Sequence, residues 1–91
     1  MRIVWTTTAL RRVADIVADL EVRDASHARE TLTRIFEAVD VLTKFPEMGR
    51  VVPEVGKQHI REIFLEPYRI VYGIRRRQIS IRTVRHMTEQ R

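Results

Sequence analysis

The sequence contains no cysteine, which limits the kinds of structure and site that the chain can build. Without thiols, neither a disulfide framework nor a thiolate metal site is available, and this fits a reducing cytoplasm. Glycine and proline each occur only three times, and the chain shows no repeat, linker or low-complexity tract. No apolar run approaches a membrane span, and the apolar part of the N-terminal MRIVWTTTAL is too short for a signal peptide. We therefore expect a cytoplasmic protein.

The composition that remains is typical of a globular domain whose charge is unevenly spread. Hydrophobic residues make up 44% and charged residues 32% of the 91 positions, so residues 1–91 predict one small domain with a single core. Residues 1–45 hold seven basic and seven acidic residues, whereas residues 46–91 hold ten basic and five acidic ones. The whole net charge of +5 lies in this C-terminal half. It indicates a polyanionic or acidic partner for one surface; the alternative is a basic surface that serves only solubility.

Two helices are predicted by apolar residues that recur at helical spacing. A short strand, Arg2–Trp5, precedes a run of threonines, of which Thr6 or Thr7 caps the first helix. The second helix starts after Asp24 or Ser26 and stops at KFPEMG, where a proline forbids continuation. The short connection predicts an antiparallel hairpin with facing apolar stripes. The first stripe is Leu10, Val13, Ala14, Val17 and Leu20, and the second is Ala28, Leu32, Ile35, Phe36, Val39 and Leu42.

Three further strands are predicted in the second half of the chain. The segment RVVPEVGKQ is predicted to be a loop. Strand-like runs follow at Ile60–Leu65, Tyr68–Ile74 and Gln78–His86, separated by turns at Glu66–Pro67 and Gly73–Gln78. The resulting β-α-α-β-β-β order predicts an α+β fold, in which the helical hairpin packs on one face of a mainly antiparallel four-stranded sheet.

Side-chain alternation predicts which way the last two strands face. The side away from the helices is expected to show Arg69, Arg82 and His86, together with Val71 and Val84. Three cationic or titratable groups on one face of adjacent strands favour a functional surface. The side packed on the helices is expected to carry Tyr68, Ile70, Tyr72, Ile74, Ile79, Ile81 and Thr83.

The arginines of these strands also have simpler interpretations. Arg69 is a side chain that can pair with a carboxylate such as Glu62 or Glu54. Arg75–Arg77 fall in a hairpin turn and are most simply a solvated cluster of charge. The first of the three strands is apolar on both sides, so that either Arg61 or Glu62 joins the arginine side, and we favour Arg61.

Three segments, FPEMGRVVPE, REIFLEPYRIVYGI and ISIRTVRH, resemble the RelE/ParE superfamily of toxins from bacterial type II toxin–antitoxin modules. The resemblance spans the chain and includes the β-α-α-β-β-β order and the start of the first helix, ALRRVADI. It implies a cytoplasmic toxin that inhibits growth, serves plasmid stabilization and forms a hetero-oligomer with a cognate antitoxin. The antitoxin of such a module wraps a segment over the toxin's sheet and helical hairpin. Neither a cofactor nor a metal is expected.

The superfamily divides into two activities that share one fold. RelE-like members cleave mRNA in the ribosomal A site without a metal, whereas ParE-like members poison DNA gyrase. Metal-free cleavage needs a base, an acid and cations near the phosphorus, and the resemblance assigns these roles to Glu54, Arg69, Arg82 and His86. The nuclease branch commonly has a tyrosine after this histidine. Here that residue is Met87, whose thioether neither stacks like a phenol nor transfers a proton.

The remaining features favour the ParE-like branch. Lys57 is the only lysine in the loop that would grip RNA phosphates, and no aromatic residue is predicted on the arginine side, as a general RNA-binding module would need. We therefore favour inhibition of DNA gyrase, with a ribosome-dependent mRNA interferase as the alternative. In either case the surface that binds the antitoxin or the target is expected to include Arg61, Arg69, Arg82, Arg85 and His86.

Overall fold

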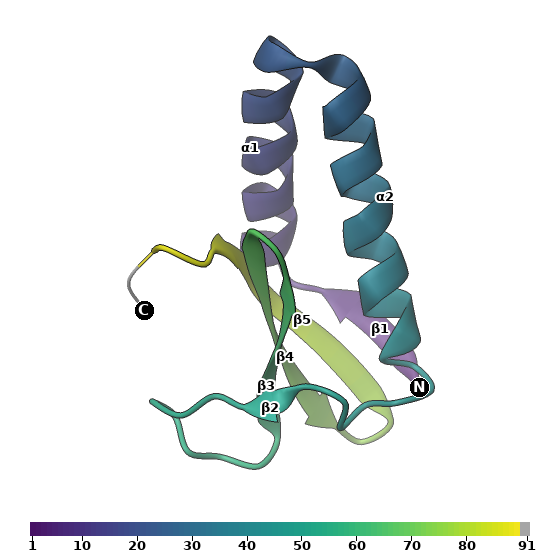
Figure 1. Cartoon of the computed structure of the whole chain (residues 1–91). Helices are drawn as coiled ribbons and strands as arrows, with labels where there is room; N and C mark the ends of the chain where they lie inside the picture. The colour runs from purple at the N-terminus through teal and green to yellow at the C-terminus, as the bar shows by residue number, and fades with distance from the viewer. Residues whose placement is uncertain (90–91) are drawn as a thin grey trace.

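The computed structural model describes residues 1–89 and shows two helices standing on one face of a five-stranded sheet (Figure 1). The strands lie in the order β1-β5-β4-β3-β2, with β1 parallel to β5 and the other neighbours antiparallel. The predicted α+β fold is confirmed, and a two-residue strand, β2, adds a fifth member to the sheet. Neither helix in this part of the chain is long and apolar enough to cross a membrane. The elements are β1 (Arg2–Trp5), α1 (Thr7–Arg23), α2 (Ala25–Val41), β2 (Arg50–Val51), β3 (Ile60–Leu65), β4 (Tyr68–Arg75) and β5 (Gln78–His86).

The two helices form the predicted antiparallel hairpin, and side-chain caps fix where they begin. The Thr6 hydroxyl accepts a hydrogen bond from the Ala9 amide at 3.1 Å, as an N-cap does. Asp24 lies between the helices. Its amide donates to the Leu20 carbonyl at 2.8 Å, and its carboxylate accepts from two amides in the first turn of α2. A single residue therefore ends α1 and starts α2, which keeps the connection short.

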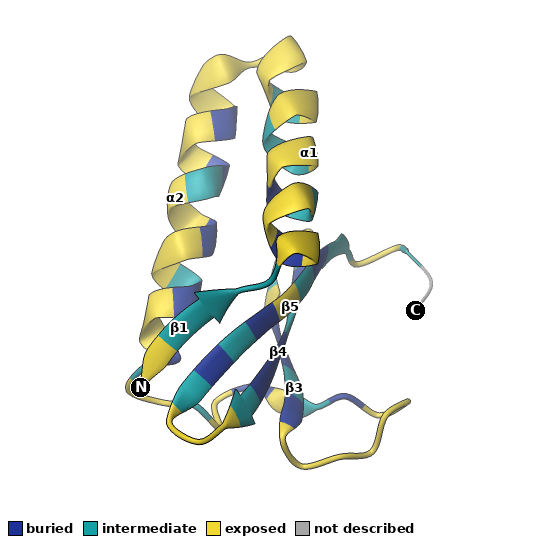
Figure 2. Cartoon of the chain, turned by 180° about the vertical axis from the view of Figure 1, so that it is seen from behind, coloured by how far each residue is buried: buried dark blue, intermediate teal, exposed yellow. Residues whose placement is uncertain are grey.

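The core lies between the sheet-proximal half of the hairpin and one face of the sheet, which we call the helix-covered face. Figure 2 shows buried positions on β4, β5 and the inward sides of the helices. Two residues predicted for the core, Leu10 and Phe36, are instead 51% and 44% exposed. α1 buries Ala9 and Val13, so Leu10 points about 100° away from Ala9. Phe36 meets Trp5 edge-on at the rim of the core, with ring centroids 5.2 Å apart. The large hydrophobic residues that are fully enclosed are Ile35, Leu42, Ile70, Tyr72, Ile79, Ile81 and Val84.

A β-bulge at Arg82 decides which way the end of β5 faces. Tyr72 pairs with Ile81. Its neighbour Val71 pairs with Thr83, which leaves Arg82 as an extra residue of β5. Because side chains alternate along a strand, one extra residue reverses the facing of every residue that follows it.

This reversal corrects the predicted orientation of three residues. Thr83 lies on the sheet face away from the helices, which we call the outer face, and not on the helix-covered face. Val84 is fully buried opposite Ile70, and His86 lies opposite Tyr68 on the helix-covered face. The predictions for Thr83, Val84 and His86 are wrong because the segment IRTVRH gives no sign of an extra residue.

Strand β3 presents Glu62, and not Arg61, to the outer face. Ile63 pairs with Ile70 of the core, and Arg61 shares that side of the strand. The prediction that Arg61 joins the other arginines is therefore wrong. Because β3 is apolar on both sides, its orientation is decided by its pairing with β4. The Arg61 guanidinium donates instead to the Gly49 carbonyl at 2.9 Å and fastens the segment after α2.

Tyr72 fastens the same segment from inside the core. Its hydroxyl donates to the Pro46 carbonyl at 2.7 Å and accepts from the Gly49 amide at 3.0 Å. Burial raises the pKa of Tyr72 above its ordinary value of 10.0, which favours the protonated hydroxyl that this donated bond requires. A Cβ at position 49 would lie 2.6 Å from the Glu62 carbonyl oxygen and 2.7 Å from the Tyr72 hydroxyl. Only glycine permits this close approach.

The substitution Tyr72→Phe is expected to lower the free energy of unfolding by about 1–3 kcal/mol, because it leaves the Gly49 amide buried without a partner. Urea denaturation followed by circular dichroism measures the change. Tyr68→Phe is the matched control, since the Tyr68 hydroxyl forms no hydrogen bond among residues 1–89, and its expected cost is about 0.5 kcal/mol or less. Equal losses in the two variants would contradict the assigned role of Tyr72.

Candidate functional site

The outer face of the sheet is the candidate functional site, because three arginines from neighbouring strands share it. Arg69 and Arg85 are paired directly across β4 and β5, where two like charges are unfavourable unless they are compensated. Arg82 lies on the same face. Gly73 is on the same side of β4 as Arg69, and a Cβ atom on Gly73 would lie 3.8 Å from the Cδ and Nη1 atoms of Arg82. The bulge therefore places Arg85 on this face and turns His86 away to the helix-covered face.

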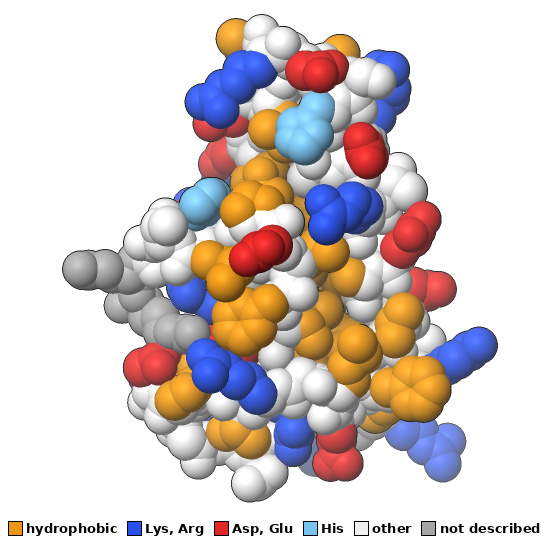
Figure 3. All heavy atoms as spheres, viewed as in Figure 1, with side chains coloured by type: hydrophobic (Ala, Val, Ile, Leu, Met, Phe, Trp, Pro, Cys, Tyr) orange, Lys and Arg blue, Asp and Glu red, His pale blue; other side chains and the backbone are white. Residues whose placement is uncertain are grey.

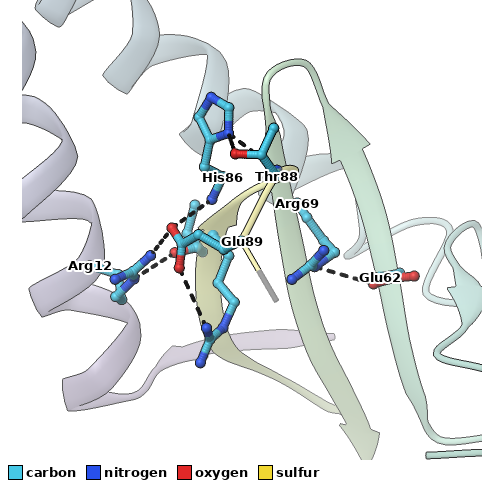
Figure 4. A network of polar contacts seen from close by, with 8 residues as sticks. Arg12, Glu62, Arg69, His86, Thr88 and Glu89 are labelled. Atoms are coloured by element: carbon cyan, nitrogen blue, oxygen red, sulfur yellow. Dashed lines mark hydrogen bonds and ion pairs between the residues drawn. The ribbon is translucent and has the colours of Figure 1, made fainter. Parts of the chain in front are cut away.

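A buried carboxylate compensates these charges. The Glu62 side chain is fully buried between two guanidinium groups. Its Oε2 accepts from the Nε of Arg50 at 2.8 Å. Its Oε1 lies 3.7 Å from the Nε of Arg69 (Figure 4). The Arg50 side chain is 54% exposed but that of Arg69 only 5%. The proposed pairing of Arg69 with Glu62 is confirmed, and Arg69 is an interior charge.

Arg69 also lines a small cavity on the outer face. Its Nε and Nη2 atoms are buried and form no hydrogen bond within residues 1–89. The cavity has a volume of about 160 Å³ and is lined by Val52, Glu54, Val55, Arg69, Val71 and Arg85. The structure thus brings three of the predicted site residues, Glu54, Arg69 and Arg85, around one volume. No group of three potential metal ligands occurs in this described part of the chain.

Glu89 joins a second group of charges where β5 ends (Figure 4). Its carboxylate pairs with Arg12 of α1 and, at 3.4 Å, with Arg85. It also accepts a hydrogen bond from the His86 amide at 3.1 Å. This amide bond, together with the charges of Arg12 and Arg85, lowers the pKa of Glu89 from its ordinary value of 4.5. Sequence reasoning missed Arg12 and Glu89, because a contact between residues 77 positions apart leaves no local signal.

His86 lies on the other side of the sheet from the arginines. Its Nδ1 accepts a hydrogen bond from the Thr88 amide at 3.2 Å, so the neutral ring carries its proton on Nε2. The ring meets Tyr68 edge-on, with centroids 5.9 Å apart. It lines a cleft of about 540 Å³ between the helical hairpin and the ends of β4 and β5. The sheet therefore separates His86 from Arg69 and Arg82, so the residues assigned to cleavage from the sequence do not form one site. The cleft of His86 has arginines of its own, Arg12, Arg23 and Arg34.

Hydrophobic side chains also reach the surface. Figure 3 shows them gathered over the middle and lower part of one face, with basic side chains at its lower edge. Phe45 and Met48 are 62% and 59% exposed and line a shallow pocket after α2. On the outer face Phe64 is 47% exposed, and the Arg50 guanidinium lies 5.1 Å from its ring centroid. Exposed apolar groups beside basic ones are typical of a protein-binding surface.

Comparison with known proteins identifies the family. The family model described as ParE toxin of type II toxin-antitoxin system, parDE, matches residues 3–91. The chain therefore belongs to the ParE toxin family. The predicted membership of the RelE/ParE superfamily, on its ParE-like side, is confirmed. As a ParE-type toxin of a type II toxin–antitoxin system, the protein has an antitoxin partner.

Two relatives agree with this membership. The protein Y4kP of Sinorhizobium fredii (strain NBRC 101917 / NGR234), which its name classes as a candidate toxin, is 40% identical over 92 residues. The match covers 98% of this chain and 91% of that protein. A solved structure, described as the chromosomal ParDE TA system from P. aeruginosa, has a TM-score of 0.79 at 21% identity. It covers 94% of this chain and 95% of the other, which shows a shared fold.

The substitution Glu62→Gln is expected to lower the free energy of unfolding by about 3–5 kcal/mol, because it leaves Arg69 as a buried charge without its counter-charge. Urea denaturation at neutral pH measures the loss. Glu66→Gln is the matched control, since Glu66 is exposed in the turn between β3 and β4, and its expected cost is about 0.5 kcal/mol or less. A Glu62→Gln variant as stable as this control would show that Glu62 does not support the buried arginine.

Proposed function

We propose that this ParE-type toxin inhibits DNA gyrase in the cytoplasm, and that its antitoxin blocks this action by covering the outer face. The single observation that carries the choice of target is the position of His86. Metal-free RNA cleavage needs the acid–base group and the cations at one phosphate. In this chain His86 lines a cleft beneath the helices, whereas Arg69, the strand arginine that the resemblance assigns to cleavage, lines a cavity on the outer face. The arginines that line the His86 cleft, Arg12, Arg23 and Arg34, come instead from the helices.

Ribosome-dependent mRNA cleavage is the alternative, and the outer cavity is the observation in its favour. Glu54, Arg69 and Arg85 surround this cavity, so that a carboxylate and two cations lie near one volume. However, about 160 Å³ is well below the roughly 300–1,000 Å³ of ordinary ligand pockets. Two of the Arg69 nitrogens are also enclosed. Both facts favour gyrase inhibition over cleavage at this cavity.

The antitoxin is proposed to lay an acidic and apolar segment over the accessible part of the outer face. Arg82 is exposed there, and Arg50 and Phe64 lie beside each other at its edge. Such a surface offers positive charge together with an aromatic anchor. Arg69 is too deeply buried to bind a partner directly, and it acts by holding β3 and β4 together through Glu62.

Gyrase inhibition is tested with toxin freed from its antitoxin. In a supercoiling assay with purified gyrase, the toxin is expected to reduce the supercoiled product. In a parallel translation-coupled assay, the mRNA is expected to remain intact. Cleavage of the mRNA with undisturbed supercoiling would contradict the proposal and favour the interferase.

Two variants connect the same assays to particular residues. His86→Gln does not titrate near neutral pH, and it is expected to inhibit supercoiling within about twofold of the wild type, whereas loss of a true general acid or base lowers a rate by about 10²–10⁴. Arg82→Glu is expected to weaken inhibition by about tenfold or more, because it reverses a charge on the proposed binding surface. Arg29→Glu, exposed on α2, is its matched control. Equal effects of the two charge reversals would exclude a specific contact at Arg82.

A further inference from the structure

The turn between β4 and β5 contains three consecutive arginines in a strained backbone. Arg75 pairs with Gln78, so Arg76 and Arg77 form a two-residue loop. Both have positive φ angles, 49° and 64°. Asparagine and glycine adopt this left-handed conformation with the least strain, which is why they dominate such turns. Two arginines here cost folding stability that an Asn-Gly turn would keep, and retained backbone strain is a reason to look for a function.

The turn projects from the lower end of the sheet beside the N-terminus (Figure 1). β3 pairs with β4 only as far as Gly73, and β1 pairs with β5 only from Gln78, so neighbouring strands do not cover the turn. Arg2 joins the turn, because its amide donates to the Arg77 carbonyl at 3.0 Å and its guanidinium to the Gln78 side chain at 2.9 Å. We call Arg2 and the three turn arginines the arginine tip.

The arginine tip is exposed and uncompensated. All four side chains are exposed, and none of them forms an ion pair with any of residues 1–89. This contrasts with the outer face, where Glu62 and Glu89 lie against arginines. Four guanidinium groups without an ion pair, one at the start of β1 and three at the turn between β4 and β5, produce a strong local positive potential.

We infer that the arginine tip binds backbone phosphates of duplex DNA. The inference rests on the proposed gyrase inhibition, since gyrase acts on a DNA duplex and a toxin bound to gyrase would have this duplex nearby. Guanidinium groups form paired hydrogen bonds with phosphate oxygens. The segment 75–78 offers no apolar side chain, whereas an interface with an acidic protein segment depends on apolar or aromatic anchors. A cluster of charge alone suits a regularly charged backbone better.

The double substitution Arg76→Asn with Arg77→Gly separates charge from stability. It installs the favoured turn sequence, so the melting temperature is expected to rise. DNA binding is expected to weaken at the same time. With a fluorescein-labelled duplex of about 25 bp at 0.15 M salt, anisotropy should show an affinity loss of about tenfold or more, and the slope of log affinity against log salt should fall by about two. These effects should be independent of DNA sequence.

Two matched variants complete the experiment. Arg76→Lys with Arg77→Lys keeps charge and turn strain, and it is expected to bind DNA within about threefold of the wild type. Arg11→Gln with Arg29→Gln removes two exposed charges from the helices and is expected to leave DNA affinity within about twofold. If the Asn-Gly variant binds DNA as the wild type does, or if the helix variant loses as much affinity, the inference is wrong. The inference would also be wrong if a polyglutamate peptide or single-stranded RNA displaced the labelled duplex at a lower concentration than unlabelled duplex DNA does.

The supercoiling assay keeps the two proposals distinguishable. If the wild type inhibits gyrase and the Asn-Gly variant retains both inhibition and DNA affinity, DNA binding by the arginine tip is rejected. The proposed gyrase inhibition is then unaffected. A wild type that binds duplex DNA through the tip but leaves supercoiling unchanged rejects gyrase as the target and keeps the DNA contact.

Discussion

One extra residue in β5 decides which side chains of this strand lie on each face of the sheet. The bulge at Arg82 reverses the alternation of the strand that follows it, so Val84 enters the core and Arg85 comes to lie opposite Arg69. For the same reason the His86 side chain lies on the side of the sheet that faces the helices. A nuclease site that combined this histidine with the sheet arginines would need an unbroken alternation in β5. The composition of the outer face and the separation of His86 from the sheet arginines thus have one geometric cause.

Electrostatic compensation governs the outer face that results. Two arginines paired directly across neighbouring strands repel one another, and a small domain has little stability with which to offset an unpaired interior charge. Glu62 meets Arg69 from the neighbouring strand, while Glu89 meets Arg85 from beyond β5. The arginine tip at the end of the sheet has no such counter-charges within residues 1–89. The chain therefore combines arginines that stabilise its fold, such as Arg69, with exposed arginines that a partner can reach, such as Arg82 and those of the arginine tip.

Local sequence signals predicted the elements well because their causes are local. The caps at Thr6 and Asp24 and the stop before Pro46 follow from side chains next to the backbone groups they affect. The predicted facing of side chains was wrong in β3 and at the end of β5, where facing depends on how the strand pairs with β4. The segment IRTVRH alternates without interruption, so nothing in it marks Arg82 as extra, and β3 is apolar on both sides until β4 selects Glu62 for the outer face. The contact between Arg12 and Glu89 joins residues 77 positions apart, so no local pattern predicts it.

The facing of β5 decides on which side of the sheet His86 lies, and solution NMR of the isotopically labelled toxin tests this facing directly. Cross-strand nuclear Overhauser effects should place the backbone of Ile70 opposite Val84, and ring protons of His86 should contact those of Tyr68. An unbulged strand would instead place Ile70 opposite Thr83 and bring the His86 ring to the face of Arg69. Observation of that second pattern would contradict the assigned facing of β5 and would favour the nuclease mechanism over gyrase inhibition.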